Sequence, residues 1–287
     1  MGVRDTSLAT VKAECPMPLP SRFWQDLTWP DFRTLPANTV AVLPVGAIEQ
    51  HGPHLPVAVD TAINQGIVAR TLKVIPDDLP VLVLPTQAVA LSVEHLRFPG
   101  TITTSAETLI ALICDIGASV ARAGVKRLVF LNSHGGNVSA LDIAARRLRI
   151  QHGLFVVNAM WARMGKPEAL RDPVEARFGI HAGRDETAVM LALRPDLVRM
   201  DKARNFVSRW QGVSAATPSM APDAGAPPAW QAQDLGGAGA VGNASAATVE
   251  IGEALLDHAA QRMAALWQQV AGMDVSTWLD GEPNPDA

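Results

Sequence analysis

Short apolar runs that alternate with segments of helical spacing constrain the fold of this chain more than any other feature. The runs are rich in branched residues and stand at 39–46 (TVAVLPVG), 81–85, 127–131 (RLVFL) and 154–158. Helical spacing is found at 61–74, 107–123, 138–150, 186–193 and 248–270. Strands that are apolar throughout and alternate with helices predict a mostly parallel sheet with helices on both faces. The expected fold class is therefore α/β.

The composition supports one folded domain with less regular ends. The 287 residues are 48% hydrophobic and 18% charged, so a sizeable core can be buried. We expect a single domain over 21–275, a flexible leader over 1–20 and a frayed tail over 276–287. Within the domain, 212–245 is rich in Ala, Gly, Pro and Ser. This bias predicts a long irregular loop, either functional or disordered.

Charge, hydropathy and cysteine content limit the classes of partner. The net charge of −4 gives no basic footprint, so no nucleic-acid partner is expected. No run reaches the roughly 18 apolar residues of a spanning helix, and the N-terminus lacks the apolar run of a secretory signal. No membrane partner is therefore expected. Cys15 and Cys114 suggest no disulfide framework and favour a reducing compartment, which predicts a cytoplasmic protein.

The first polar motif, 49–56 (EQHGPHLP), follows the apolar run 39–46. Glu49 and His51 are two residues apart, so both side chains point to one side if strand geometry persists. Asp60 stands at the start of the next predicted helix, where the chain can bring its carboxylate back to the same place. Two carboxylates and an imidazole suit Zn, Mn or Fe. The alternative is a loop whose polar groups only cap turns and helices.

Two further motifs carry histidine and acid side chains. His134 lies in NSHGGN (132–137), directly after the run 127–131, and the Gly135–Gly136 pair leaves backbone N–H groups open to a ligand. Glu186 lies in HAGRDET (181–187), in the first turn of a predicted helix. A histidine satisfied in a turn, and an acid placed by the helix dipole, are the alternatives. Because ligands bind beyond the carboxyl ends of parallel strands, the conjunction of the three motifs predicts a metal site.

In this order, EQHGPHLP with Asp60, NSHGGN and HAGRDET resemble the signature of the creatininase family of metal-dependent amidohydrolases. VEHLRFPGT (93–101) and GAVGNASAAT (239–248) are also similar to segments of that family. The resemblance implies a sandwich-like α/β fold, a homo-oligomer that is often a hexamer, and two divalent ions per chain (Zn, Mn or Fe). It implies hydrolysis of a cyclic or linear amide, a small-molecule substrate, by metal-activated water.

The resemblance also implies roles for single residues. Glu49 and His51 would bind different metals, Asp60 would bridge them, and His134 would complete one site. Creatininase proper has a glutamate ligand two residues after this histidine, where this chain has Gly136. Glu186 is predicted to fill that gap, either as a ligand or as a group that orients the water. His181 matches the catalytic acid/base, which protonates the leaving nitrogen.

The predicted substrate contacts differ from those of creatininase proper. Trp161 matches one of its tryptophans, but a second one, expected four residues before His181, is Arg177 here. Arg184 stands where many relatives have Glu. These departures disfavour creatinine, and the two arginines favour a substrate with an anionic or carbonyl-rich end, unless they are solvated surface charges. The backbone N–H groups of Gly135 and Gly136 are expected to bind an oxyanion. His95 is expected to line the pocket.

Two other functions stay open. One is hydrolysis of formamides or peptide bonds, within the same family. The other is a catalytically silent binding or assembly protein that keeps this fold, which Gly136, Arg177 and Arg184 would favour. The retained acid and histidine residues of the three motifs argue against a protein without catalytic activity.

Overall fold

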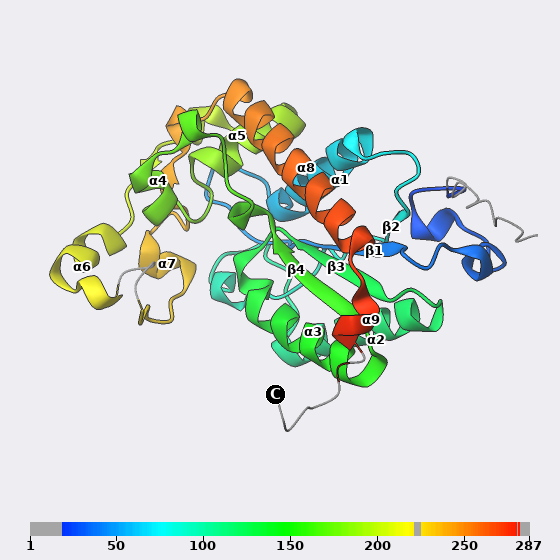
Figure 1. The fold of residues 1–287 in the computed structure, drawn as a ribbon. Helices are drawn as coiled ribbons and strands as arrows, with labels where there is room; N and C mark the ends of the chain where they lie inside the picture. The colour runs from blue at the N-terminus through cyan, green and yellow to red at the C-terminus, as the bar shows by residue number, and fades with distance from the viewer. Residues whose placement is uncertain (1–18, 221–224, 280, 282–287) are drawn as a thin grey trace, which may run out of the picture.

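A computed structural model describes residues 19–220, 225–279 and 281, and Figure 1 shows its central parallel sheet. The four strands lie in the order β2-β1-β3-β4, and every pairing is parallel. They are β1 (Val40–Val45), β2 (Val81–Val83), β3 (Arg127–Asn132) and β4 (Phe155–Met160). Each coincides with one of the predicted apolar runs to within two residues at either end, so these predicted strands are confirmed.

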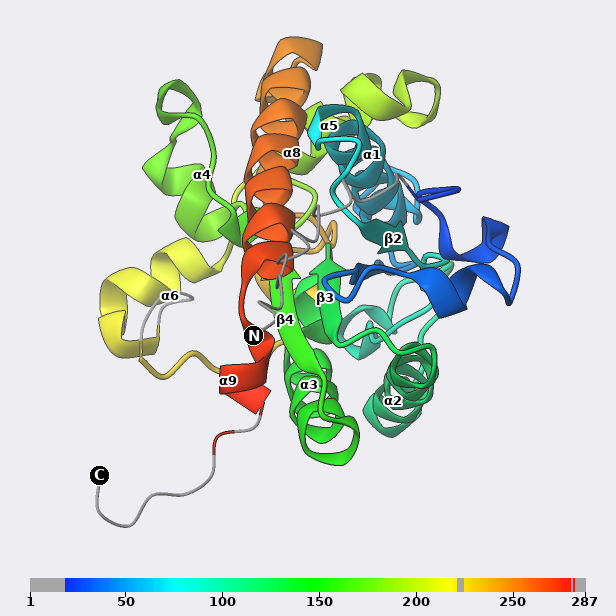
Figure 2. The same cartoon turned by 45° about the vertical axis from the view of Figure 1, so that its right-hand side comes forward.

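Helices cover both faces of the sheet (Figures 1 and 2). One face carries α1 (Val59–Val74), α5 (Arg184–Leu193) and α8 (Val249–Gly272), and the other carries α2 (Ala106–Arg122) and α3 (Val138–His152). The predicted α/β class, a single domain with a mostly parallel sheet between two helical layers, is thereby confirmed.

Strand β1 is apolar throughout because both of its faces are buried. Val40 and Val42 of β1 pack into the core beneath α1, α5 and α8. Ala41 and Leu43, which alternate with them, pack into the core on the side of α2 and α3. Successive side chains of a strand point to opposite faces, so a strand with helices on both sides has no position for a solvated residue.

Helix α8 packs closely against α5, which carries the motif residues 184–187 in its first turn. Gly252 of α8 lies so near α5 that a Cβ at this position would overlap the carbonyl group of Ala188. The absent side chain therefore lets the two helix backbones approach. The remaining elements are short and lie mostly outside these layers: α4 (Pro173–Phe178), α6 (Trp210–Ala216), α7 (Ala232–Leu235), α9 (Val275–Leu279), β5 (Asn205–Phe206) and β6 (Gly242–Asn243).

The segment 212–245, expected to be irregular, contains short helices in its described part. Part of α6 and all of α7 lie within it, and Trp210, Leu235 and Val241 form a small apolar cluster of their own. Residues 221–224 lie outside the described residues, as do 1–18 of the predicted leader. Of the predicted tail, 276–279 belong to α9. Among the described residues, no helix combines the length and apolarity needed to cross a membrane.

Candidate metal centre

The carboxyl ends of three strands lie level, and the polar motifs gather just beyond them. Val45 of β1 pairs with Asn132 of β3, which pairs with Met160 of β4. The motif 49–56 follows β1 after a short connection, and the motif 132–137 begins in the last residue of β3. Both motifs therefore stand at the edge of the sheet where parallel strands present ligand sites.

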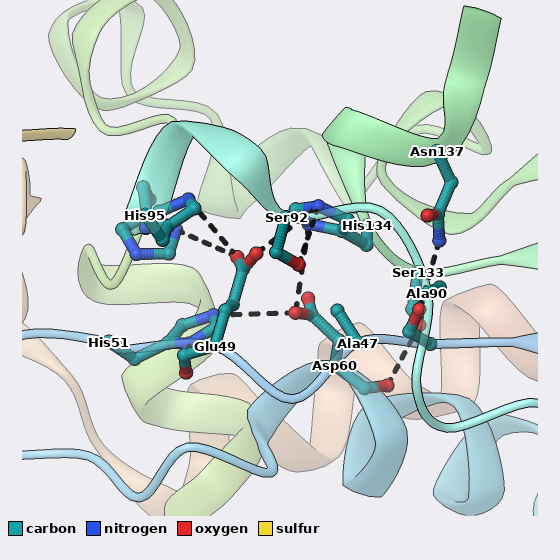
Figure 3. A network of polar contacts seen from close by, with 12 residues as sticks. Ala47, Glu49, His51, Asp60, Ala90, Ser92, His95, Ser133, His134 and Asn137 are labelled. Carbon is teal, nitrogen blue, oxygen red and sulfur yellow. Dashed lines mark hydrogen bonds and ion pairs between the residues drawn. The ribbon is translucent and has the colours of Figure 1, made fainter. Parts of the chain in front are cut away.

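Four of the five residues predicted to bind metal lie together at this edge in Figure 3. Four groups of three residues each offer ligand atoms that lie within 4.8 Å of one another, and Asp60, in the first turn of α1, belongs to two of these groups. The other two groups join Glu49 to His51 and His181, and to Glu94 and His95. The two groups that share Asp60 are called the two sets below. One set joins it to Glu49 and His134, and the other joins it to His51 and Glu186. Glu186 comes from the first turn of α5. A shared carboxylate between two sets is the arrangement that a two-metal centre needs.

The distances within the sets suit metal ligands. Oδ2 of Asp60 lies 3.7 Å from Nδ1 of His134 and 3.9 Å from Nε2 of His51. Oε2 of Glu186 lies 3.8 Å from the same nitrogen of His51, and Oε2 of Glu49 lies 3.2 Å from Nε2 of His134. The longer separations exceed a hydrogen bond. They suit two ligands of one ion, because each would bind at about 2.0–2.2 Å.

Several of these atoms are buried without a partner, which tests whether a cation fits. Both carboxylate oxygens of Glu49, Nε2 of His51 and Oδ2 of Asp60 form no hydrogen bond with any described residue. All three side chains are at most 2% exposed. Buried charges of this kind are normally paired or coordinate a metal, since desolvation is otherwise costly. The orphaned oxygen and nitrogen atoms therefore fit divalent cations.

Electrostatics around the sets point the same way. Burial favours the protonated form of Glu49, but the imidazoles of His134, His181 and His51 outweigh it and hold the pKa of this carboxyl below its ordinary value. Burial, and then the Glu49 carboxylate, raise the pKa of Asp60 well above its ordinary value. His134 has a pKa raised well above its ordinary value, because Glu49 overcomes the effect of burial. Without a metal, Asp60 and His134 therefore tend to hold protons, and bound cations would displace these protons.

Burial and neighbouring charges also shift the pKa values of the other ionisable groups of the cluster, some upward and some downward. Burial raises the pKa of Glu186 and, together with the neighbouring His181, lowers the pKa of His51 well below its ordinary value. A neutral imidazole is the form that binds metal. Burial and His181 also lower the pKa of His95 to about 4. Burial opposes ionisation of Glu94, but its hydrogen bond to His134 dominates and lowers the pKa of this carboxyl.

Buried amides hold the two strand ends in place. The Nδ2 group of Asn64, on α1, donates to the carbonyl oxygens of Val45 at 3.0 Å and Leu131 at 2.7 Å. Asn137 donates to the carbonyl oxygen of Gly46 at 2.9 Å and accepts from the backbone N–H of Leu91 at 3.0 Å. The final asparagine of NSHGGN therefore braces the loops around the site rather than facing the ligands.

His181 presents one ring nitrogen to the site. Its Nε2 lies 2.8 Å from the carbonyl oxygen of Gln50, which only accepts, so this nitrogen carries the hydrogen. Nδ1 therefore keeps its lone pair, and it lies 3.7 Å from Oε1 of Glu49. The next residue, Ala182, has φ +54° and donates its backbone N–H to Oε2 of Glu186 at 2.6 Å. The loop thus couples His181 to the acid that follows it.

A cavity of about 600 Å³ opens over the metal sets. Four of the five predicted substrate residues line it: Trp161, His95, Gly135 and Gly136. The fifth, Arg177, does not line it, because its guanidinium lies over the ring of Phe178, 5.2 Å from the centroid. Arg184 is bound to Asp185 at 2.8 Å and to the carbonyl oxygen of Leu170 at 2.7 Å.

The lining of the cavity gives no support to one expectation. Among the described residues that line it there is no lysine or arginine, so no guanidinium faces the cavity in this structure. The ionisable side chains that line it are carboxyl groups and imidazoles: Glu49, Asp60, Glu94, Glu186, His95, His134 and His181. A substrate contact by Arg177 stays a prediction, because the sequence does not show to which side of α4 its side chain points and the lining of the cavity does not include it.

Two residues of the cavity were missed by the motifs. Glu94 places Oε1 3.5 Å from Nε2 of His134, and a Cβ at Gly136 would overlap this oxygen. The glycine therefore makes room for a carboxylate from another segment. Trp230 lines the cavity from 212–245 and packs edge-on against Trp210, with ring centroids 6.5 Å apart. The family-like segment VEHLRFPGT could have pointed to Glu94. No motif marks Trp230, which lies in the segment 212–245 that was singled out only by its composition.

The parallel sheet and the buried groups of histidine and carboxylate residues that could hold a metal define an α/β protein with a candidate metal-binding site. The chain belongs to the creatininase family, because the family model described as creatinine amidohydrolase matches residues 25–267. Members of this family are hydrolases that act on carbon–nitrogen amide bonds.

Individual relatives differ in their named substrates. The mycofactocin precursor peptide peptidase of Mycobacterium tuberculosis is 41% identical over 170 residues, which cover 57% of this chain and 62% of the relative. The creatinine amidohydrolase of Pseudomonas putida is 33% identical over 200 residues, covering 63% of this chain and 75% of the relative. The chain thus spans about three fifths of the length of the mycobacterial protein.

Solved structures share the fold over almost the whole described chain. The structure titled "Creatininase Mn" matches with a TM-score of 0.68 and 28% identity, over 88% of this chain and all of its own. Solved creatininases of this group carry Zn or Mn. The ligand types gathered in the present site, carboxylate oxygens and imidazole nitrogens, suit both metals.

Proposed function

We propose that this protein is a metal-dependent hydrolase that cleaves an amide carbon–nitrogen bond with water activated by two divalent ions. The observation that carries this proposal is the pair of ligand sets that share Asp60, in which buried ligand atoms of Glu49, His51 and Asp60 have no hydrogen-bond partner among the described residues. Glu49, Asp60 and His134 would hold one ion. His51, Asp60 and Glu186 would hold the other.

Glu186 is proposed as a ligand rather than as a base. Its Oε2 accepts the backbone N–H of Ala182 and faces Nε2 of His51, so the carboxylate is fixed in the second set. It would thereby replace the carboxylate that Gly136 lacks. Glu94 reaches the opposite set, beside His134, and supplies a further negative charge to the cavity.

When bound, two such ions polarise a carbonyl group and lower the pKa of water. The chain's own groups would do the rest. His181, with Nε2 fixed by Gln50, has Nδ1 free to hold a proton and deliver it to the leaving nitrogen. Trp161 and Trp230 would bind the substrate from two sides of the cavity. Backbone N–H groups of Gly135 and Gly136 would stabilise the developing oxyanion.

The substrate class is proposed to be a linear, peptide-like amide. A second cavity, of about 470 Å³, adjoins the main one and shares Glu94, Ala229 and Trp230 with it. A chain longer than a small ring could occupy both. The relative that is 41% identical is named a peptidase, which favours the same class. A small cyclic amide is the second candidate, because two tryptophans could sandwich a flat ring.

The quaternary structure and location are also proposals. We propose a cytoplasmic homo-oligomer: the low cysteine content supports a reducing compartment, and the family resemblance supports a hexamer. Light scattering of the purified protein would measure the number of copies directly.

Elemental mass spectrometry of protein purified without chelators tests the proposal. Close to two Zn or Mn ions per chain, with turnover of linear amides that is lost on chelation and restored by metal, is the expected result. Preferred turnover of creatinine would select the cyclic class instead. Absence of metal after reconstitution with Zn, Mn and Fe would leave the silent binding or assembly protein as the better description.

A further inference from the structure

Glu175 is a buried carboxylate that belongs to neither metal set. It lies in α4 and is 6% exposed. Its Oε1 accepts the backbone N–H of Arg184 at 2.6 Å, and its Oε2 accepts the backbone N–H of Asn243 at 2.9 Å. One side chain therefore joins α4 to the start of α5 and to β6. Hydrogen bonds to an ionised acceptor are among the stronger ones in proteins.

Three glycines shape the space around this carboxylate. Cβ atoms at Gly179 and Gly183 would overlap it, and one at Gly242 would lie 2.7 Å from Oε1. Gly242 also has φ +114°, which residues with a side chain rarely adopt. The three positions come from the end of α4, the start of α5 and β6. Backbone from all three segments thus closes around a single side chain.

The segments joined by Glu175 are those that carry the acid/base side of the site. His181 lies between Gly179 and Gly183, and its carbonyl oxygen accepts the backbone N–H of Val241 at 2.9 Å. Ala182 holds a positive φ, a conformation that persists only where the surroundings enforce it. A small cavity of about 290 Å³ is lined by both Glu175 and Glu186, so the anchor and the ligand face one space.

We propose that Glu175 is a positioning residue: its carboxylate holds the loop that carries His181 and the first turn of α5 that carries Glu186. The consequence for metal binding and turnover rests on the proposed function, whereas the anchoring itself does not. Glu49 and His134 lie in the segments that follow β1 and β3, and neither is among the residues that hydrogen-bond to Glu175. The anchor should therefore affect one side of the site and leave the other side unchanged.

Glu175→Gln is the sharpest variant, because it keeps the size of the side chain. Both oxygens of Glu175 accept backbone N–H groups, so an amide would direct its own N–H₂ at one of them. Glu168→Gln is a matched control, since Glu168 lies nearby at the surface with 81% of its side chain exposed. Glu175→Asp keeps the charge but is too short to reach both donors, and intermediate effects are expected from it.

Amide hydrogen exchange on the metal-free full chain tests the anchor without reference to activity. Glu175→Gln should raise exchange in peptides that cover 179–187 and leave peptides of β3 unchanged, with Glu168→Gln matching the wild type. Unchanged exchange over 179–187 would overturn the proposal. So would a uniform rise across all peptides, because that is the result of general destabilisation. If Glu175→Gln fails to fold, the same comparison is made with Glu175→Asp.

Metal titration and kinetics then test the consequence. In Glu175→Gln, one of two Mn²⁺ ions should bind about 10–100-fold more weakly and kcat should fall by a similar factor, with KM little changed. Equal weakening of both ions would contradict the one-sided anchor. A wild-type chain that binds no Mn²⁺ or Zn²⁺ would refute the proposed function, while the exchange result would still decide whether Glu175 anchors the loop.

Discussion

The two sides of the site are built in different ways. Glu49, Asp60 and His134 lie next to β1 and β3, where buried amides such as Asn64 tie the strand ends together. His181, Glu186, Trp161 and Trp230 come from 161–245, where the elements between Trp161 and α5, and beyond it, are short. In the proposed function, the sheet side supplies three of the metal ligands, and the other side supplies Glu186 and the groups expected to meet the substrate. This chain departs from creatininase proper on both sides, at Gly136 after His134 and at Arg177 before His181.

The largest effect is expected at the residue that both sets share. Asp60→Ala should abolish metal loading and turnover together, because it removes a ligand from each set. The loss should exceed the about 10–100-fold cost of changing a group that only supports a ligand. Metal content by elemental mass spectrometry and amide turnover are the measurements.

Asp142→Ala is the matched control, since its carboxylate is exposed on α3, away from the ligand sets. Circular dichroism of both variants separates metal loss from unfolding. Full metal content and turnover in Asp60→Ala would show that Asp60 does not bridge the sets, and the division into two sides would then need a different boundary.

His181→Gln tests whether the two sides can be separated. Turnover should fall by about 10²–10⁴-fold, the usual contribution of an acid/base group, while both ions remain bound. The reason is that the two proposed ligand sets do not include His181. Metal content and kcat are measured on the same samples, with His152→Gln, exposed at the end of α3, as the control. Loss of one ion in His181→Gln would make this histidine a ligand beside Glu49 and His51.

The sequence predicted the sheet side better than the substrate side, for physical reasons. The strands Val40–Val45 and Arg127–Asn132 are recognisable because burial on both faces leaves their interior positions apolar. Motifs that follow such strands must lie at one edge of the sheet. The number of residues between a strand and the motif that follows it can be read directly from the sequence. The structure brings the acid and histidine side chains of the three motifs together, and their roles as metal ligands stay a prediction.

The other side depends on contacts between distant segments. Gly136 was interpreted as a lost ligand, whereas its missing side chain admits the carboxylate of Glu94, some forty residues earlier in the chain. Trp230 reaches the cavity from a segment whose composition predicted only an irregular loop. Arg177 was assigned to the substrate from its position before His181, and its contact with Phe178 shows another orientation. Orientation and long-range packing of this kind leave no periodic signal.

Trp230→Ala should change substrate affinity and leave metal binding intact. The ring forms one wall of the cavity and packs on Trp210, and such aromatic contacts are worth about 0.5–1.5 kcal/mol beyond their buried area. KM for a linear amide should rise by roughly tenfold, which corresponds to about 1.4 kcal/mol. Trp278→Ala is the control, because Trp278 is 61% exposed on α9. An unchanged KM with a lower metal content would place Trp230 on the metal side instead.

The smallest effect is expected at Arg177, and it sharpens the comparison because a sequence-based argument predicts the opposite. If Arg177 bound an anionic group, Arg177→Gln would raise KM for substrates with a carboxylate and spare neutral ones. The structure places the guanidinium over Phe178, away from the lining of the cavity, so both KM values should stay within about twofold of the wild type, the range of a surface change below about 0.5 kcal/mol. Kinetics with a matched pair of amides, one ending in a carboxylate and one in a neutral amide, measure this difference. A selective loss with the carboxylate substrate would mean that α4 turns Arg177 toward the substrate on binding. The substrate side would then be rearranged by its ligand, whereas the ligand sets at the sheet edge would keep their geometry.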